Sequence, residues 1–302
     1  MGGPAPGAAR GLMSRIARAR CPEEVLELVR RHLESFDHIH TTTCLYKLAK
    51  LRAVRREDAA VRALAREHAR HLGGGVLDGR QLANTLWACA TCPQSSVFAP
   101  RFLQEAARQI ACRARSLKHQ DLSNSLWALA VLDEGGPEVA RRLMSSQAMA
   151  HPAGFKPQEL SNTIWALATW SFGGAVASLR PLVASAAARE AELEPQHLAN
   201  VSWALASVEL ADASSLCRIA GEACRKVAQF KTQELSNPSW ALAPLATGTA
   251  DVSVLGVLAS HASVRLPEFK HQEFVNIAWA FAEATRGGSR RSQAARVFEM
   301  VP

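Results

Sequence analysis

The chain has few aromatic residues, no long apolar run and no paired set of cysteines. Only 6% of its 302 residues are aromatic, with seven Trp and a single Tyr. No apolar stretch approaches the roughly 18 residues that a membrane-spanning helix needs, so we expect no contact with a membrane. Seven scattered Cys, an odd number, do not make the disulfide framework of a secreted protein. A reducing compartment fits this composition.

Catalytic and metal-binding patterns are also missing from the sequence. Cys89 and Cys92 form the only Cys pair with metal or redox spacing, but Cys89 takes the place that Leu129 and Leu167 have after the Trp-Ala of other repeats. The ten His do not cluster, and Gly73-Gly74-Gly75 lacks the Lys-Ser/Thr of a phosphate-binding loop. We therefore expect a binding protein and not an enzyme, with no metal, cofactor or small-molecule substrate.

The apolar content is mostly alanine and leucine, and β-branched residues are sparse. This balance favours helix over sheet, and it predicts an all-α chain. Although the length would suggest about two domains, an array of stacked repeats grows without a second core. We therefore expect one elongated domain.

One phrase recurs six times: Leu or Phe, any residue, then Asn-x-x-Trp-Ala-x-Ala. The tryptophans are spaced by 40, 38, 38, 37 and 39 residues, at Trp87, Trp127, Trp165, Trp203, Trp240 and Trp279. A period near 38 residues is too long for one helix and too short for a domain, so each unit is one supersecondary element stacked on its neighbours. With a degenerate first copy, in which Tyr46 replaces Trp and Thr43 replaces Asn, the sequence predicts an α-solenoid of about seven helix-turn-helix repeats.

Three segments follow from this pattern. Residues 1–21 form a basic segment with no acid before Glu23, as in an organelle transit peptide; a basic tail on a cytoplasmic protein is the alternative. Residues 22–39 hold a capping helix, and residues 40–302 hold the array, whose last unit is cut short at the C-terminus. Pro238 and Pro244 should kink or partly unwind their layer.

Angular position separates the faces of the first helix of each repeat. Taking 100° per residue, Leu122, Leu126 and Leu129 make the core stripe, whereas the Gln, Asn and Trp of each phrase lie together on another face. Stacked layers would align the amides into a ladder for an extended ligand. Alternatively, the Asn fastens a neighbouring loop, and the Trp is a core residue. The ladder residues are Gln120, Asn124, Gln158, Asn162, Gln196, Asn200, Gln233, Asn237, Gln272 and Asn276.

Specificity has to lie in positions that vary between repeats. Two and four residues before the Trp, many of these positions carry small hydroxyl side chains that would suit contact with base edges, at roughly one base per repeat; tolerance on a solvated surface is the alternative. The candidates for base selectivity are Thr85, Ser123, Ser125, Ser161, Thr163 and Ser236.

Charge is concentrated at the N-terminus. Of the net charge of +8, +6 lies in residues 1–80, which carry 15 Lys and Arg against 9 Asp and Glu, so the repeat body is almost neutral. Nine residues before the Trp, four repeats carry a lysine that could follow phosphates, although Glu194 interrupts the series. These candidates are Lys118, Lys156, Lys231 and Lys270.

The phrase from Gln158 to Ala168, with its copies, resembles the octotricopeptide and heptatricopeptide repeats of algal and protist organelle proteins. Those repeats are similar to the helical repeats of FAST-kinase-like and RAP-domain proteins. The resemblance covers about residues 40–300 and implies a solenoid that binds single-stranded RNA in mitochondria or plastids. It would act in transcript stability, processing, translation or ribosomal RNA maturation. No RAP-like domain follows the repeats. The near-neutral repeat body leaves open a protein-binding scaffold of the armadillo or HEAT kind.

Overall fold

The computed structural model describes residues 6–55, 57–92, 97–170, 173–208, 212–243 and 251–286. The regular structure in these ranges consists of 15 α-helices joined by 3₁₀ turns and loops, and the ranges contain no strand. The prediction of an all-α chain is therefore confirmed. No helix within these ranges has both the length and the apolar character needed to cross a membrane.

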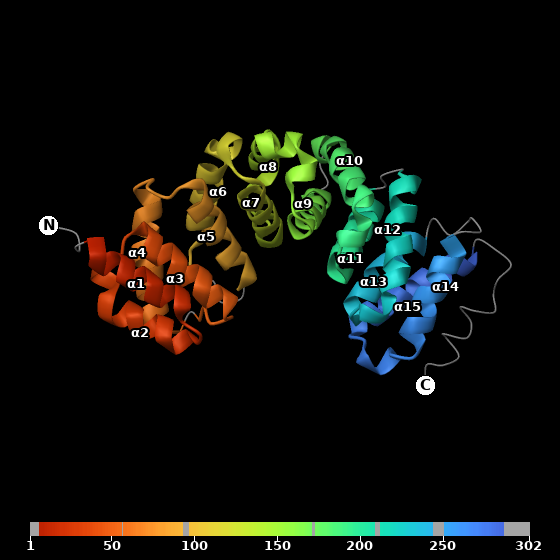
Figure 1. Cartoon of the computed structure of the whole chain (residues 1–302), viewed down its shortest axis with the longest axis horizontal. Coiled ribbons are helices and arrows are strands. Elements are labelled where there is room, and N and C mark those ends of the chain that lie inside the picture. Colours follow the sequence, from red (N-terminus) through yellow and green to blue (C-terminus); the bar gives the residue numbers. More distant parts are fainter. Residues whose placement is uncertain are drawn as a thin grey trace. The chain divides into compact units, whose positions relative to one another are not determined.

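The chain divides into two compact units, Met1–His151 and Pro152–Pro302. Figure 1 shows the helices of each unit following one another in chain order. The first unit contains α1 (Pro6–Arg18), α2 (Pro22–His32), α3 (His38–Lys50), α4 (Ala59–Gly73), α5 (Gly79–Thr91), α6 (Pro100–Cys112), α7 (His119–Leu132) and α8 (Gly136–Met144). The second unit contains α9 (Pro157–Trp170), α10 (Gly173–Ala188), α11 (Pro195–Ser207), α12 (Ala213–Lys226), α13 (Thr232–Leu242), α14 (Asp251–Ser263) and α15 (His271–Arg286).

Helices pack in the same alternating way within each unit. Helix α5, which carries the first complete phrase, lies between α3 and α7, while α4, α6 and α8 contact one another in sequence. In the second unit α11 lies between α9 and α13, α13 contacts α15, and α10, α12 and α14 form the accompanying series. Each phrase-bearing helix except α15 also contacts the helix that follows it. This sequential packing is consistent with a solenoid.

The phrase-bearing helices are covered on several sides. In α7 the predicted core stripe is confirmed, because Leu122, Leu126 and Leu129 are fully buried. Ala128 is also fully buried, since its small side chain lets a neighbouring helix approach closely. Only the side chains near the Asn124 direction stay open between the first turn and the last. Hence the Leu and Ala of the phrase pack the layers together.

Most phrase-bearing helices begin in the same way. An apolar residue, such as the buried Leu117 or Phe155, precedes an extended capping residue. The side chain three residues beyond the cap then accepts a hydrogen bond from the backbone N–H of the cap, as Glu234 does from Lys231 at 2.8 Å. This contact satisfies a backbone donor that the first helical turn leaves without a partner. It recurs between Asp78 and Gln81, Lys156 and Glu159, Glu194 and His197, and Lys270 and Glu273.

A basic side chain in the turn before a phrase-bearing helix reaches back to the preceding layer. The guanidinium of Arg189 donates to the carbonyl oxygen of Phe155 at 2.9 Å. Lys226 donates to the carbonyl oxygen of Leu193 at 2.8 Å. Arg265 does the same to Phe230, and Arg113 to Gly75. We call these four bonds the interlayer clamps, and the sequence analysis did not anticipate them.

Helix α1 is an integral part of the first unit. Its Leu12 and Ile16 belong to the same buried cluster as Leu45 and Leu48 of α3. Lys47 of α3 donates a hydrogen bond to the carbonyl oxygen of Ala17 at 3.0 Å. Cleavage of a transit peptide after residue 21 would therefore remove part of this core. Residues 22–39, where a capping helix was expected, contain α2, a 3₁₀ turn at Leu33–Ser35 and the first two residues of α3.

Pro238 does not interrupt the helix that contains it. Helix α13 continues through Pro238 to Leu242 and shows no break in the described residues, although it is shorter than α9 or α15. Of the two expected outcomes for this layer, a kink or partial unwinding, unwinding at Pro238 is not seen. Pro244 and the expected truncated end of the array, residues 287–302, lie outside the described residues.

Candidate ligand-binding face

The Gln, Asn and Trp positions of the phrase lie on one open face of each helix. In α7 Gln120 is exposed, and Asn124 and Trp127 are half-buried, while the residues between them are buried apart from Asp121. The same gradient recurs in α9, α11 and α13 of the second unit. We call these positions, with their counterparts in α3, α5 and α15, the ladder face. Its grouping on one side of the helix was predicted correctly.

The side-chain amides of most phrase Asn residues make no hydrogen bond to the described part of the fold. No hydrogen bond joins the side chain of Asn84, Asn124, Asn162, Asn200 or Asn237 to another described residue. The exception is Asn276, whose Oδ1 accepts from Gln272 at 2.9 Å. These amides do not fasten a loop, so the structural alternative for the Asn is not supported. A donor and an acceptor remain open in each of these five layers.

The tryptophans are only partly in the core. Five of the six phrase tryptophans are half-buried, and Trp279 is 42% exposed. Their rings approach one another between layers, with centroids 6.0 Å apart for Trp165 and Trp203 and 6.2 Å apart for Trp240 and Trp279. The interpretation of Trp as a plain core residue is therefore too simple. These four rings pack in pairs, and each stays partly exposed.

The first layer follows the same plan with different residues. Tyr46 of α3 packs against Trp87 of α5, with ring centroids 4.9 Å apart. Its place at the Trp position is thus confirmed. Thr43 stands at the Asn position of this layer, and its hydroxyl donates to the carbonyl oxygen of Ile39 at 2.7 Å.

The six hydroxyl residues expected to select bases are buried. Thr85, Ser123, Ser125, Ser161, Thr163 and Ser236 are each at most 1% exposed. Four of these hydroxyls donate to a carbonyl one turn earlier in their own helix, as Thr163 does to Glu159 at 2.8 Å, and the hydroxyl of Ser236 has no partner among the described residues. These positions face the neighbouring layers, so their side chains do not reach a ligand. The expectation that these six side chains contact bases is therefore wrong for this structure.

The varying positions that do share the ladder face lie four residues after the Trp. Thr91, Val131 and Ser207 are half-buried there, and Thr169 is exposed. They continue the helical spacing of Asn and Trp on the same side. That spacing was visible in the sequence, but only the structure shows which directions around the helix remain open.

The four recurring lysines lie at the starts of phrase-bearing helices. Lys118 and Lys231 are the capping residues of α7 and α13, with extended backbone and exposed side chains. Lys231 Nζ lies 4.0 Å from a carboxylate oxygen of Glu234. In α11 the capping residue is Glu194, and its backbone N–H donates to Nδ1 of His197 and not to a Glu carboxylate. The helix start is therefore kept in the repeat that lacks the lysine. The backbone N–H of this position serves the helix start, a role that any residue except proline can fill.

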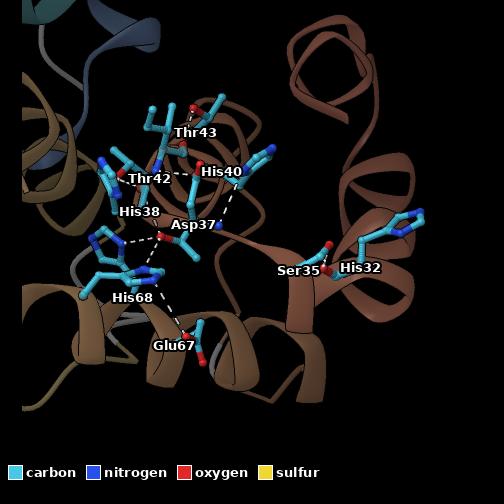
Figure 2. A network of polar contacts seen from close by, with 12 residues as sticks. His32, Ser35, Asp37, His38, His40, Thr42, Thr43, Glu67 and His68 are labelled. Atoms are coloured by element: carbon cyan, nitrogen blue, oxygen red, sulfur yellow. Dashed lines mark hydrogen bonds and ion pairs between the residues drawn. The ribbon is translucent and has the colours of Figure 1, made fainter. Parts of the chain in front are cut away.

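A buried histidine of α4, His68, contacts hydroxyl groups of α3 and α5. Figure 2 shows His68 with the neighbouring polar side chains of α3. His68 is fully buried, with Nε2 2.8 Å from the hydroxyl of Thr85 and Nδ1 3.0 Å from the hydroxyl of Thr41. Because Thr85 donates to the carbonyl oxygen of Gln81, its oxygen accepts from Nε2–H of His68. Burial lowers the pKa of His68 to about 3, with smaller contributions from His71 and His38.

The described residues contain no cluster of three or more side chains suited to hold a metal ion. Burial raises the pKa of Cys89 to about 12, which keeps this thiol protonated. None of the seven cysteines forms a disulfide. Among the described residues, the open amide and indole groups of the ladder face are thus the recurring polar feature that the fold does not use.

No protein-family model matches this sequence, and no curated protein is significantly similar to it.

Proposed function

We propose that the chain is an α-solenoid of about seven helix-turn-helix repeats that binds single-stranded RNA along its ladder face. The observation that carries this proposal is the set of open Asn amides. Five layers of a densely packed fold repeat the same half-buried amide with no hydrogen bond to the described residues. A recurring polar group of this kind suits a ligand that repeats along its length.

The chemistry of each layer matches a nucleotide. An Asn amide offers a donor and an acceptor to the edge of an unstacked base. The half-exposed indole beside it offers an aromatic surface, on which bases stack irrespective of sequence. Exposed Lys118, Lys156, Lys231 and Lys270 at the helix starts would meet phosphates. Base preference would come from Thr91, Val131, Thr169 and Ser207, because these side chains vary between layers and share the open face.

The cellular role follows from the resemblance of the repeats. It would lie in organelle RNA metabolism, in transcript stability, processing, translation or ribosomal RNA maturation. The compartment would be the matrix of a mitochondrion or plastid. Import with α1 retained agrees best with the place of Ile16 in the core.

A peptide is the second candidate ligand, and the charge of the helix starts favours it. In α9, α13 and α15 the capping lysine is followed three residues later by Glu159, Glu234 or Glu273, so a phosphate would meet both signs of charge. An extended peptide backbone needs no net positive charge, and it pairs equally well with Asn amides.

Selection from a random single-stranded RNA pool at physiological salt tests the RNA proposal. We expect an enriched motif of several nucleotides. The triple variant Asn162→Ala, Asn200→Ala, Asn237→Ala should bind the selected RNA at least about tenfold more weakly, since three amides that pair with bases are removed. Gln147→Ala with Gln229→Ala is a control that removes two exposed amides outside the ladder face.

Two results would contradict the RNA proposal. One is the absence of any enriched motif together with weak, sequence-independent binding. The other is equal affinity of the triple Asn variant and the wild type. Recovery of peptides from a displayed library, with loss of binding in the same triple variant, would support the peptide ligand instead.

A further inference from the structure

The ladder face of the first unit ends in a cavity of about 320 Å³. This volume falls within the range of roughly 300–1,000 Å³ that is usual for ligand pockets. Its walls come from four helices, α1, α3, α5 and α7. The ladder residues among its lining are Thr43, Tyr46, Arg80, Asn84 and Gln120. The cavity is therefore part of the face assigned to RNA.

A second cavity of about 380 Å³ shares Lys47 and Lys50 with the first. Arg18 and Arg20, from the end of α1 and the residues after it, also line it. The two cavities thus gather five basic side chains, Arg18, Arg20, Lys47, Lys50 and Arg80, against one acidic side chain in their linings, Asp121.

These five basic side chains have no acidic partner in the part of the fold that the structure describes. Within these residues no carboxylate lies within ion-pair distance of any of them. Many arginines on other helices are paired along the helix surface, for example Arg31 with Glu27 at 2.6 Å and Arg142 with Glu138 at 2.8 Å. Like charges around shared cavities repel one another, and a bound anion relieves that repulsion.

At the end of the ladder face beside α1, a basic side chain replaces the amide that later repeats carry at the Gln position. Arg80 occupies the position held by Gln in the next five layers, and Thr43 occupies the position of Asn. Ala17 of α1 lines the cavity, and its carbonyl oxygen accepts from Lys47 Nζ, so α1 closes this end of the face. A strand lying along the amides of α7 and α5 would meet α1 here.

We propose that this basic cavity pair is an anchor for RNA phosphate at the N-terminal end of the ladder face. The inference rests on the proposed RNA-binding function. The shared chemistry is a phosphate oxyanion, which comes either from a terminal monophosphate of the RNA or from an internal phosphodiester. Lys50 and Arg80 contact the phosphate, and Lys47, held by Ala17, is a positioning residue.

The test compares the full chain with the double variant Lys50→Gln, Arg80→Gln. Arg80→Gln restores the residue found at this position in the other layers, and neither side chain has a partner among the described residues that the fold would lose. The matched control is Arg66→Gln with Arg115→Gln, which removes the same charge from exposed sites of the same unit away from both cavities. Thermal unfolding of all three proteins checks that the fold is kept.

Binding of one short RNA is measured over a salt series, with a 5′-monophosphate, a 3′-monophosphate or no terminal phosphate. We expect the double variant to bind at least about tenfold more weakly than the control. The slope of log affinity against log salt should be reduced by about 0.7 for each phosphate charge that the variant no longer neutralises, which is about 0.7 for an internal phosphodiester and up to about 1.4 for a terminal monophosphate. A terminal monophosphate is the source if its removal weakens the wild type and not the double variant. An internal phosphodiester is the source if all three RNAs lose affinity equally in the variant.

Equal affinity and equal salt slope in the double variant and the control would overturn the anchor and leave RNA binding itself standing. Failure of the wild type to bind any RNA would overturn both the anchor and the proposed function. The two failures are therefore distinguishable in the same experiment.

Discussion

The guanidinium of Arg265 donates to the backbone carbonyl oxygen of Phe230 at 2.6 Å, across 35 residues of sequence. Phe230 is the buried residue before the start of α13, and Arg265 lies between α14 and α15. The bond therefore connects successive layers of the second unit. Since its acceptor is part of the main chain, it holds the layers whatever side chain stands at position 230.

Removal of this clamp should destabilise the second unit. We expect Arg265→Leu to lower the free energy of unfolding by about 1–2 kcal/mol, because a charged donor and a half-buried carbonyl lose their bond. Urea unfolding followed by circular dichroism measures the change. Arg108→Leu is the control, since its exposed guanidinium pairs only within its own helix, with Glu105. Equal effects of the two variants would show that the clamp contributes nothing beyond an ordinary surface pair.

Acid should weaken the first unit through His68. Its pKa is lowered to about 3 in the fold, so between about pH 6.5 and pH 3 the unfolded chain binds a proton that the folded chain does not. The stability is fully present above pH 6.5 and is lost progressively as the pH falls. We expect the urea midpoint to fall less steeply between pH 7 and pH 5 in His68→Gln, whose amide keeps a donor and an acceptor but does not titrate.

The exposed His151 provides the control for this pH dependence. His151→Gln should keep the slope of the wild type. Some slope should remain in His68→Gln, since burial also lowers the pKa of His71 and of His197. An unchanged slope in His68→Gln would mean that His68 is protonated in the folded chain at these pH values.

A single ladder substitution should separate stability from binding. Asn200→Ala removes a side chain that makes no hydrogen bond to the described residues, so the free energy of unfolding should change by less than about 0.5 kcal/mol. Affinity for the selected RNA should nevertheless fall, measured by fluorescence anisotropy. A large loss of stability with unchanged affinity would assign the Asn a packing role after all.

Two threonines of α9 offer a matched pair for base preference. Thr163 is fully buried and Thr169 is exposed, and each donates its hydroxyl to a carbonyl one turn earlier. We expect Thr169→Val to change the nucleotide preferred at one position of the selected motif, and Thr163→Val to leave the motif unchanged. Sequencing of RNA selected by each variant tests this, and the opposite result would restore the buried hydroxyls as selectivity residues.

The sequence predicted the helices, the core stripe and the grouping of the ladder face because these depend on periodicity alone. Leu126 and Asn124 differ in direction around the helix, and that difference is fixed by about 100° per residue. Periodicity does not say which directions are covered. Within each unit the first helices of successive repeats pack on one another and on the second helices, and the side chains of Ser125 and Thr163 are buried as well.

The interlayer clamps and the contacts at the helix starts could not be predicted from the sequence, because they involve main-chain atoms. Arg189 and Arg265 donate to backbone carbonyls, which leave no mark on the amino acids at positions 155 and 230. Likewise the backbone N–H of Lys156 donates to Glu159, a contact in which the lysine side chain takes no part. The hydrogen bonds of the main chain had to be seen before these positions could be interpreted.

Because the tryptophans are half-buried, their fluorescence can report whether a ligand is bound to the ladder face. Trp165, Trp203 and Trp240 are three of the four environment-sensitive fluorophores of the second unit's ladder face, and each lies beside an Asn. A ligand that covers the amides necessarily changes the surroundings of these indoles. Emission spectra of single-Trp variants would therefore show, layer by layer and without an attached dye, how far along the second unit a bound strand extends.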